Sequence, residues 1–201
     1  MNEKPWLWLL AGPNGAGKST NAPNLFATIG KIIGPDAIAV RLLPTAPEKA
    51  ALTAGREAIR HIREALKERR SFAIETTLSG RFHFQIVQTA SSEDWNIGLV
   101  YIGLRSQELA IQRVRQRRRT GGHHVPAADV RRRYERSLRN LPLFLQLADA
   151  VVVLDNSPTK HRIKMVLQAR RGKVTFRARR LPTWLHGSLK AIRRSPPNRR
   201  Q

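Results

Sequence analysis

The chain has 201 residues, a formal net charge of +23 and no cysteine. Its length suits one α/β domain with a short appendix, and the lack of cysteine excludes disulfides, thiolate metal sites and a cysteine nucleophile. No apolar run approaches the ~18 residues of a membrane span, and the short apolar stretch at 6–11 lacks the cleavage site of a secretory leader. We therefore expect a cytoplasmic protein with no membrane contact.

The positive charge is concentrated in two regions. Residues 105–139 carry 11 Lys and Arg against 3 Asp and Glu, and residues 156–201 carry 14 against none. Such surfaces attract polyanions, so the C-terminal third raises nucleic acid as a partner. Aromatic residues are few and are not interleaved with the basic runs, which makes base stacking, and so nucleic acid, the less favoured interpretation.

The first predicted strand, 5–11, leads into a phosphate-binding pattern. Gly12-x4-Gly17-Lys18-Ser19 has the spacing of a P-loop, and it follows a strand as that motif requires. Lys18 can reach the β- and γ-phosphates of a bound nucleotide, and Ser19 can place its hydroxyl on Mg²⁺. The helix that follows presents free N–H groups and the positive end of its dipole. The residues expected to bind ATP or GTP here are Gly12, Pro13, Asn14, Gly15, Ala16, Gly17, Lys18, Ser19 and Thr20.

Strand and helix patterns alternate along the rest of the chain. Further strands are predicted at 31–34, 71–77, 96–104 and 149–155. Helices are predicted from the P-loop to about 28, and at 37–43, 48–70, 81–90, 106–119, 126–147 and 159–170. This alternation predicts an α/β fold of the P-loop NTPase class, with five parallel strands and right-handed crossovers. A kinase-like strand order, 2-3-1-4-5, is expected.

The C-terminal region has weaker signals. Residues 173–179 alternate like an edge strand, 181–192 suit a short helix, and 193–201 resemble a disordered tail. We therefore expect a kinase-like domain at 1–171, with an arginine-rich lid at about 106–133. A basic, partly disordered appendix would follow at 172–201.

Two acids end apolar strands in the manner of a Walker B element. Glu75 ends the run at 71–75, and Asp155 ends the run at 151–155. In the expected order the Glu75 strand lies beside the P-loop strand, near the switch point where ligands gather, so Glu75 is the better candidate for an Mg²⁺ water shell or a substrate hydroxyl. Asp155, Asn156 and Ser157 suit either a loop near the nucleotide base, with Asn156 as a contact, or a capping turn before the next helix.

Asp36 follows the second predicted strand. A carboxylate there would face the γ-phosphate and could accept the proton of an attacking hydroxyl, as a general base. Asp before a short helix is also a favoured N-cap, so both interpretations stay open. Thr76, Thr77 and Ser79 follow Glu75 directly and suit either substrate recognition or a plain turn.

The lid candidates are arginines on two helices. A positioned arginine stabilises the charge of a transferring phosphoryl group. Arg113 and Arg117 share one helix face, as do Arg115 and Arg119, and only one face can look toward the phosphates. We expect this to be the face of Arg113 and Arg117, with Arg118 as an alternative and one of Arg131, Arg132 and Arg133 as a further contributor.

An ordered set of short motifs resembles the zeta toxin family, in the branch often labelled predicted ATPases. The resemblance covers about 11–157. The motifs are Gly12–Thr20, Pro35-Asp36, Ala54-Gly55-Arg56, Glu75-Thr-Thr-Leu-Ser-Gly80, Arg113-Val114, Gly121-Gly122-His123, Val125-Pro126, Arg132-Arg133-Tyr134 and Asp155-Asn156-Ser157. Two departures stand out: Gly34 occupies a position where a polar residue is common, and the chain is shorter than the founding toxins.

The resemblance implies a kinase that transfers the γ-phosphate of a nucleotide to a hydroxyl of UDP-N-acetylglucosamine or a similar small, anionic acceptor. It implies that Lys18 binds phosphate, Ser19 holds Mg²⁺ and Asp36 is the base. Glu75 and Thr77 would touch the acceptor, and lid arginines would neutralise the transferring group. It also implies a toxin whose partner is an antitoxin protein. The alternative function, which the basic C-terminal third motivates, is a nucleic-acid-binding NTPase or a polynucleotide kinase.

Overall fold

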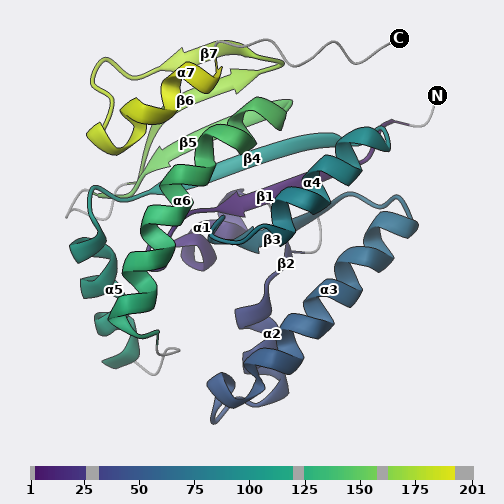
Figure 1. Ribbon diagram of the computed structural model, residues 1–201, viewed down its shortest axis with the longest axis vertical. Helices are drawn as coiled ribbons and strands as arrows, with labels where there is room; N and C mark the ends of the chain where they lie inside the picture. Colours follow the sequence, from purple (N-terminus) through teal and green to yellow (C-terminus); the bar gives the residue numbers. More distant parts are fainter. Residues whose placement is uncertain (1–2, 26–31, 120–124, 158–162, 193–201) are drawn as a thin grey trace.

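The computed structural model describes residues 3–25, 32–119, 125–157 and 163–192. Parallel strands form the centre of one sheet: β1 (Trp6–Ala11), β2 (Ile32–Ile33), β3 (Phe72–Thr76), β4 (Asn96–Gly103) and β5 (Ala150–Asp155). Their spatial order is β2-β3-β1-β4-β5 (Figure 1), so the predicted P-loop α/β fold and the order 2-3-1-4-5 are confirmed. The strands are apolar because helices cover both faces of the sheet.

Two antiparallel strands extend the sheet beyond β5, so it has seven strands rather than the expected five. β6 (Lys164–Arg170) pairs with β5, and β7 (Lys173–Arg177) pairs with β6. The helix predicted at 159–170 is therefore wrong for the part that the structure describes. The turn between the strands, Arg171–Gly172, has positive φ at both residues, 47° and 74°. Such a two-residue turn joins antiparallel strands into a hairpin.

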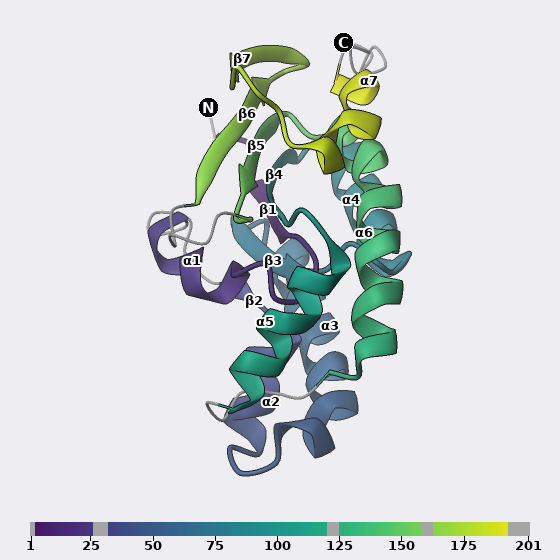
Figure 2. The same cartoon turned by 90° about the vertical axis from the view of Figure 1, so that its left-hand side faces the viewer.

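The helices cover the two faces of the sheet unequally (Figure 2). α3 (Ala51–Lys67), α4 (Phe82–Ser92) and α6 (Ala127–Leu147) pack on one face. α1 (Lys18–Leu25) and α5 (Gln107–Arg119) pack on the other. α2 (Pro35–Leu42) and a 3₁₀ turn, η1 (Pro47–Ala50), precede α3. Within the described ranges, no helix combines the length and apolarity needed to cross a membrane.

The C-terminal segment returns to the main sheet. A second 3₁₀ turn, η2 (Thr183–Ser188), and α7 (Leu189–Ile192) pack on α6. Leu185 is fully buried, and Trp184 lies over Gly103, where a Cβ atom would come within 2.2 Å of the indole ring. Residues 193–201, expected to be a disordered tail, lie outside the described residues. The fold thus brings the carboxyl ends of β1, β3, β4 and β5 to one edge, and the loops at this edge carry the predicted site residues.

Candidate active site

The P-loop joins β1 to α1, and three of its residues, Gly12, Gly15 and Gly17, are glycines with positive φ. Gly12 has a φ of +143°, and a Cβ there would lie 2.1 Å from the carbonyl oxygen of Ile102. Gly15 has a φ of +75° and packs against Ala110 of α5. Positive φ and close backbone approach are the conditions that glycine tolerates. The loop is therefore held between β4 and α5.

Asn14 is the polar side chain inside this loop. It is 7% exposed, and its Oδ1 atom has no hydrogen-bond partner among the described residues. Buried polar atoms normally have a partner, so an unpaired acceptor in a P-loop points to a ligand donor or an ordered water. Asn14 lines the same pocket as Lys18.

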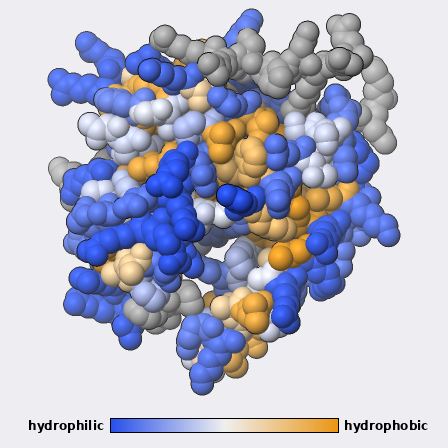
Figure 3. Space-filling model, in the orientation of Figure 1, coloured by the Kyte–Doolittle hydropathy of each residue, from blue (hydrophilic) through white to orange (hydrophobic). Residues whose placement is uncertain are grey.

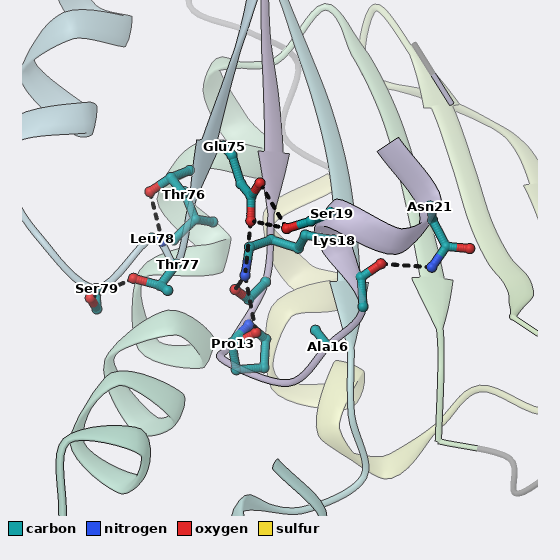
Figure 4. A network of polar contacts seen from close by, with 12 residues as sticks. Pro13, Ala16, Lys18, Ser19, Asn21, Glu75, Thr76, Thr77, Leu78 and Ser79 are labelled. Atoms are coloured by element: carbon teal, nitrogen blue, oxygen red, sulfur yellow. Dashed lines mark hydrogen bonds and ion pairs between the residues drawn. The ribbon is translucent and has the colours of Figure 1, made fainter. Parts of the chain in front are cut away.

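Lys18, Ser19 and Glu75 meet at the start of α1 (Figure 4). Lys18 Nζ donates to the carbonyl oxygens of Gly12 (3.0 Å) and Pro13 (3.2 Å), and lies 3.9 Å from Glu75 Oε1. Ser19 Oγ donates to the Glu75 carboxylate, at 3.1 Å from each oxygen. Burial lowers the pKa of Lys18 from its usual value, and the carboxylates of Glu75 and Asp36 oppose that shift. The expected phosphate-binding cation thus lies beside the expected acid.

A pocket of about 320 Å³ opens beside these residues. Figure 3 shows the molecule hollowed near its centre, with hydrophilic residues to the left of the hollow and hydrophobic residues to its right. The polar side chains that line the pocket are Asn14, Lys18, Asp36, Glu75, Thr76, Thr77, Ser79, His83 and Arg133. The structure therefore brings the expected base, Asp36, and the expected acceptor residues, Glu75 and Thr77, to one cavity with Lys18.

Asp36 does not occupy the N-cap position that the sequence left open. The N-cap of α2 is Gly34, and Asp36 lies in the first helical turn. Gly34 also faces Glu75, because a Cβ on Gly34 would lie 3.3 Å from Glu75 Cβ. A residue with a side chain at this position would crowd Glu75, so the departure from the zeta toxin pattern keeps space beside that acid.

The loop between β3 and α4 is held in an unusual conformation. Leu78 has a φ of +55°, although it is not glycine, and its side chain is fully buried. Its N–H donates to Thr76 Oγ1 (3.0 Å), and its carbonyl oxygen accepts from Asn140 Nδ2 of α6 (2.7 Å). Thr77 and Ser79, on either side, share a hydrogen bond of 2.8 Å and line the pocket. Such a costly backbone persists where its surroundings over-determine it, which often occurs at functional sites.

His83 was not predicted as a site residue. Its Nδ1 atom is 3.1 Å from Thr76 Oγ1, and burial lowers its pKa to about 4. The imidazole is thus uncharged near neutral pH and offers one donor and one acceptor to its surroundings. The only sequence signal was a histidine eight residues after Glu75, which fits no recognised motif.

The lid arginines divide by exposure. Arg113 and Arg117 are half-buried, whereas Arg115, Arg118 and Arg119 are exposed. Arg113 packs against the P-loop at Gly15, and burial lowers its pKa, as does Arg105, while Asp155 opposes the shift. The charge of Arg117 acts on Lys18.

α6 adds one further arginine to the site. Arg133 lines the pocket and its charge acts on Lys18. Arg131 and Arg132 are exposed, and Arg132 pairs with Asp129 at 2.8 Å. The loop at 120–124, with His123, lies outside the described residues.

The loop after β5 reaches the P-loop from the other side. Asn156 Nδ2 donates to the carbonyl oxygen of Ala16 at 2.9 Å. Asp155 Oδ1 accepts from the backbone N–H of Ser157 at 3.1 Å and from Ser157 Oγ, which is a local turn. No helix follows at 164–170, because β6 occupies that range.

Comparison with known sequences gives the family. The profile of the family described as "AAA domain" matches residues 7–140, two thirds of the chain. The chain belongs to the AAA domain family. The chain is also similar in sequence to an uncharacterized protein of Haemophilus influenzae. The two are 35% identical over 123 residues, which cover 61% of this chain and 88% of that protein.

Solved structures resemble this AAA domain protein in fold. A chain of the AvrRxo1-ORF1:-ORF2 complex with ATP aligns with a TM-score of 0.65 and 16% identity, over 86% of this chain and 60% of that one. A chain of the PezAT chromosomal toxin-antitoxin system of Streptococcus pneumoniae aligns with a TM-score of 0.59 and 16% identity, over 83% and 72%. The present chain thus spans less than two thirds of the AvrRxo1 chain. The predicted resemblance to the zeta toxin family is confirmed as a resemblance of fold, and this P-loop fold indicates nucleotide binding.

The residues of this AAA domain protein fit a magnesium ion bound with a nucleotide. Mg²⁺ prefers oxygen ligands and keeps several waters, using one or two protein groups plus phosphate oxygens. Ser19 Oγ and the Glu75 carboxylate form such an oxygen pair next to Lys18. Among residues that the structure describes, no group of three or more His, Cys, Asp and Glu side chains forms an all-protein metal site. Ser19 would hold the ion, and Glu75 would hold one of its waters.

Proposed function

We propose that the protein is a phosphotransferase that moves the γ-phosphate of ATP or GTP to a hydroxyl group of a small acceptor. The observation that carries this proposal is the single pocket in which Asp36, Glu75, Thr77 and Arg133 lie with Lys18. A simple NTPase needs a water site beside its P-loop, whereas this pocket, about 320 Å³ in volume, has room for part of an organic acceptor. The neutral His83 and the hydroxyls of Thr77 and Ser79 suit the recognition of hydroxyl groups.

The chemistry can be assigned residue by residue. Lys18 binds the β- and γ-phosphates, and Ser19 holds the Mg²⁺ that neutralises their charge. Asp36 accepts the proton as the acceptor oxygen bonds to the γ-phosphorus and the bond to the β–γ bridging oxygen breaks, releasing the nucleoside diphosphate. Glu75 and Thr77 orient the acceptor. Arg113, Arg117 and Arg133 stabilise charge on the transferring group.

The acceptor and the partner follow from the resemblances. The zeta toxin pattern supports UDP-N-acetylglucosamine, or a similar anionic nucleotide sugar, as the first acceptor to test. The PezAT neighbour belongs to a toxin-antitoxin system, which supports a toxin role in the cytoplasm with an antitoxin protein as partner.

Transfer of label from γ-labelled ATP or GTP tests the proposal and identifies the acceptor. The protein is incubated with γ-labelled ATP or GTP, MgCl₂ and either UDP-N-acetylglucosamine or a metabolite extract, and the species that gains phosphate is identified. We expect Asp36→Asn to lower the transfer rate by about 10²–10⁴-fold, because a general base contributes that much, while nucleotide affinity stays close to wild type. Lys18→Ala should lose nucleotide binding itself.

The matched control is Asp94→Asn. Asp94 is an exposed acid that pairs with Lys4, and it lies at the end of the sheet opposite the P-loop. This variant should transfer phosphate at the wild-type rate. Near-wild-type transfer by Asp36→Asn would show that Asp36 is not the base.

A further inference from the structure

The C-terminal segment outside the family match makes a specific contact with the nucleotide side of the sheet. Trp184 of η2 is 9% exposed, and its Nε1–H donates to Asp155 Oδ1 at 3.3 Å. Its ring occupies the space above Gly103, the last residue of β4, and packs on Tyr101 with centroids 5.8 Å apart. The family profile ends at residue 140, so this contact belongs to a part of the chain that the profile does not cover.

Asp155 connects Trp184 to the P-loop. Asp155 ends β5 and pairs in register with Gly103, and the next residue, Asn156, donates its backbone N–H to the Gly103 carbonyl oxygen (3.0 Å). The Asn156 side chain then donates to Ala16 of the P-loop (2.9 Å) and lies over Gly17, where a Cβ would come within 2.8 Å of Nδ2. The position of Asp155 therefore sets the position of the side chain that clamps the P-loop.

Asp155 also acts on the lid. Its charge opposes the effect of burial on Arg113, which packs against the P-loop at Gly15. The hydrogen bonds on Asp155 Oδ1 come from Ser157, inside the same loop, and from Trp184, outside it. Trp184 therefore connects this carboxylate to a separate element of the chain.

We propose that Trp184 is a positioning residue for nucleotide binding: through Asp155 it holds Asn156 on the P-loop. The basic C-terminal segment is then part of the nucleotide-binding machinery rather than an independent appendage. This inference rests on the proposed binding of ATP or GTP but not on the identity of the acceptor.

The test compares nucleotide affinities by calorimetry with ATP and with GTP in MgCl₂. Trp184→Phe keeps an aromatic residue but removes the Nε1–H donor together with the outer part of the indole, whose Cζ2 and Cη2 atoms lie over Gly103. We expect it to weaken binding roughly five- to tenfold, as loss of one hydrogen bond to a charged group would, and its melting temperature measures the packing that is lost with the indole. The control is the same substitution at Trp6, which begins β1 at the end away from the P-loop. Trp6→Phe should bind ATP and GTP like the wild type.

A double variant separates positioning from general packing. If Trp184 acts through the loop at 155–157, Trp184→Phe should add little to the loss caused by Asn156→Ala. Full additivity, or wild-type affinity in Trp184→Phe, would overturn the inference while leaving nucleotide binding intact. A wild-type protein that binds neither ATP nor GTP would overturn the proposed function and this inference together.

A measurement on the wild type alone guards against a variant that does not fold. Saturation with the nucleotide should slow amide hydrogen exchange in residues 183–188, although this segment lies outside the P-loop. Unchanged exchange there, with slowed exchange at residues 12–20, would show that the segment is not coupled to the nucleotide.

Discussion

At the scale of single residues, His83 has an environment that links stability to pH. Its pKa is lowered to about 4 by burial, below the 6.5 of an exposed histidine. Between pH 6.5 and 4 the unfolded chain binds this proton and the folded chain does not, so folding stability falls as the pH falls through that window. The full shift corresponds to about 3 kcal/mol.

Urea unfolding at pH 7, 5.5 and 4.5 tests this linkage. His83→Asn places an amide where Nδ1 contacts Thr76 and removes the titrating group. We expect this variant to lose less stability than the wild type between pH 6.5 and 4. Parallel stability profiles for the two proteins would mean that His83 titrates normally in the folded state.

The residues of the P-loop could be predicted because their spacing is local. Gly12, Gly17, Lys18 and Ser19 act within one turn, and their geometry follows from a strand followed by a helix. His83 could not be predicted, and Arg133 could be predicted only as one of three arginines, because their positions depend on how α4 and α6 pack against β3, which the residue pattern does not contain. Arg131, Arg132 and Arg133 looked alike in sequence, and only the rotation of α6 directs Arg133 into the pocket.

At the scale of elements, the hold of α6 on the loop between β3 and α4 should govern acceptor recognition. Asn140→Ala removes the donor to Leu78 and frees a backbone with a φ of +55°. We expect faster amide exchange in residues 76–80 and about tenfold slower phosphate transfer, because Thr77 and Ser79 lose their fixed positions, a loss comparable to one hydrogen bond. ATP affinity should not change.

The control on the same helix is Arg139→Ala. Arg139 is the exposed neighbour of Asn140, so its variant should keep both exchange and transfer at wild-type levels. If Asn140→Ala weakened ATP binding as much as transfer, α6 would support the whole site rather than the acceptor loop.

Helices and strands could be predicted where their apolar residues recur with one clear period over several turns or residues. The stripe of Ala54, Ala58, Ile62 and Ala65 identified α3 because a long helix repeats it over several turns. The sequence of β6 was predicted to be a helix. A run of seven residues is too short to distinguish the strand period of 2.0 residues from the helix period of 3.6 residues. What makes it a strand is its pairing with β5 and β7, a long-range contact, together with the left-handed turn at Arg171–Gly172.

At the scale of the whole molecule, the basic edge strand β7 lies apart from the candidate pocket. β7 is the edge of the sheet opposite β2, and all five of its residues are exposed, including Lys173 and Arg177. The pocket balances its cations with Asp36 and Glu75, whereas residues 156–201 contain no acid. We therefore expect mutations to separate polyanion binding from the proposed catalysis.

Single-stranded DNA of about 30 nucleotides measures the polyanion affinity of this edge. Binding to it should weaken steeply with salt, because each neutralised phosphate of a single strand contributes about −0.7 to the slope of log K against log salt. The double variant Lys173→Glu with Arg177→Glu should reduce that slope by about 1.4 and leave phosphate transfer unchanged.

The control is a double variant on the exposed side of α3, Arg60→Glu with Arg63→Glu. It changes the net charge by the same amount and should alter the slope far less. If the two double variants lost affinity equally, the protein would bind DNA through its net charge of +23, and the basic hairpin would not be a distinct surface.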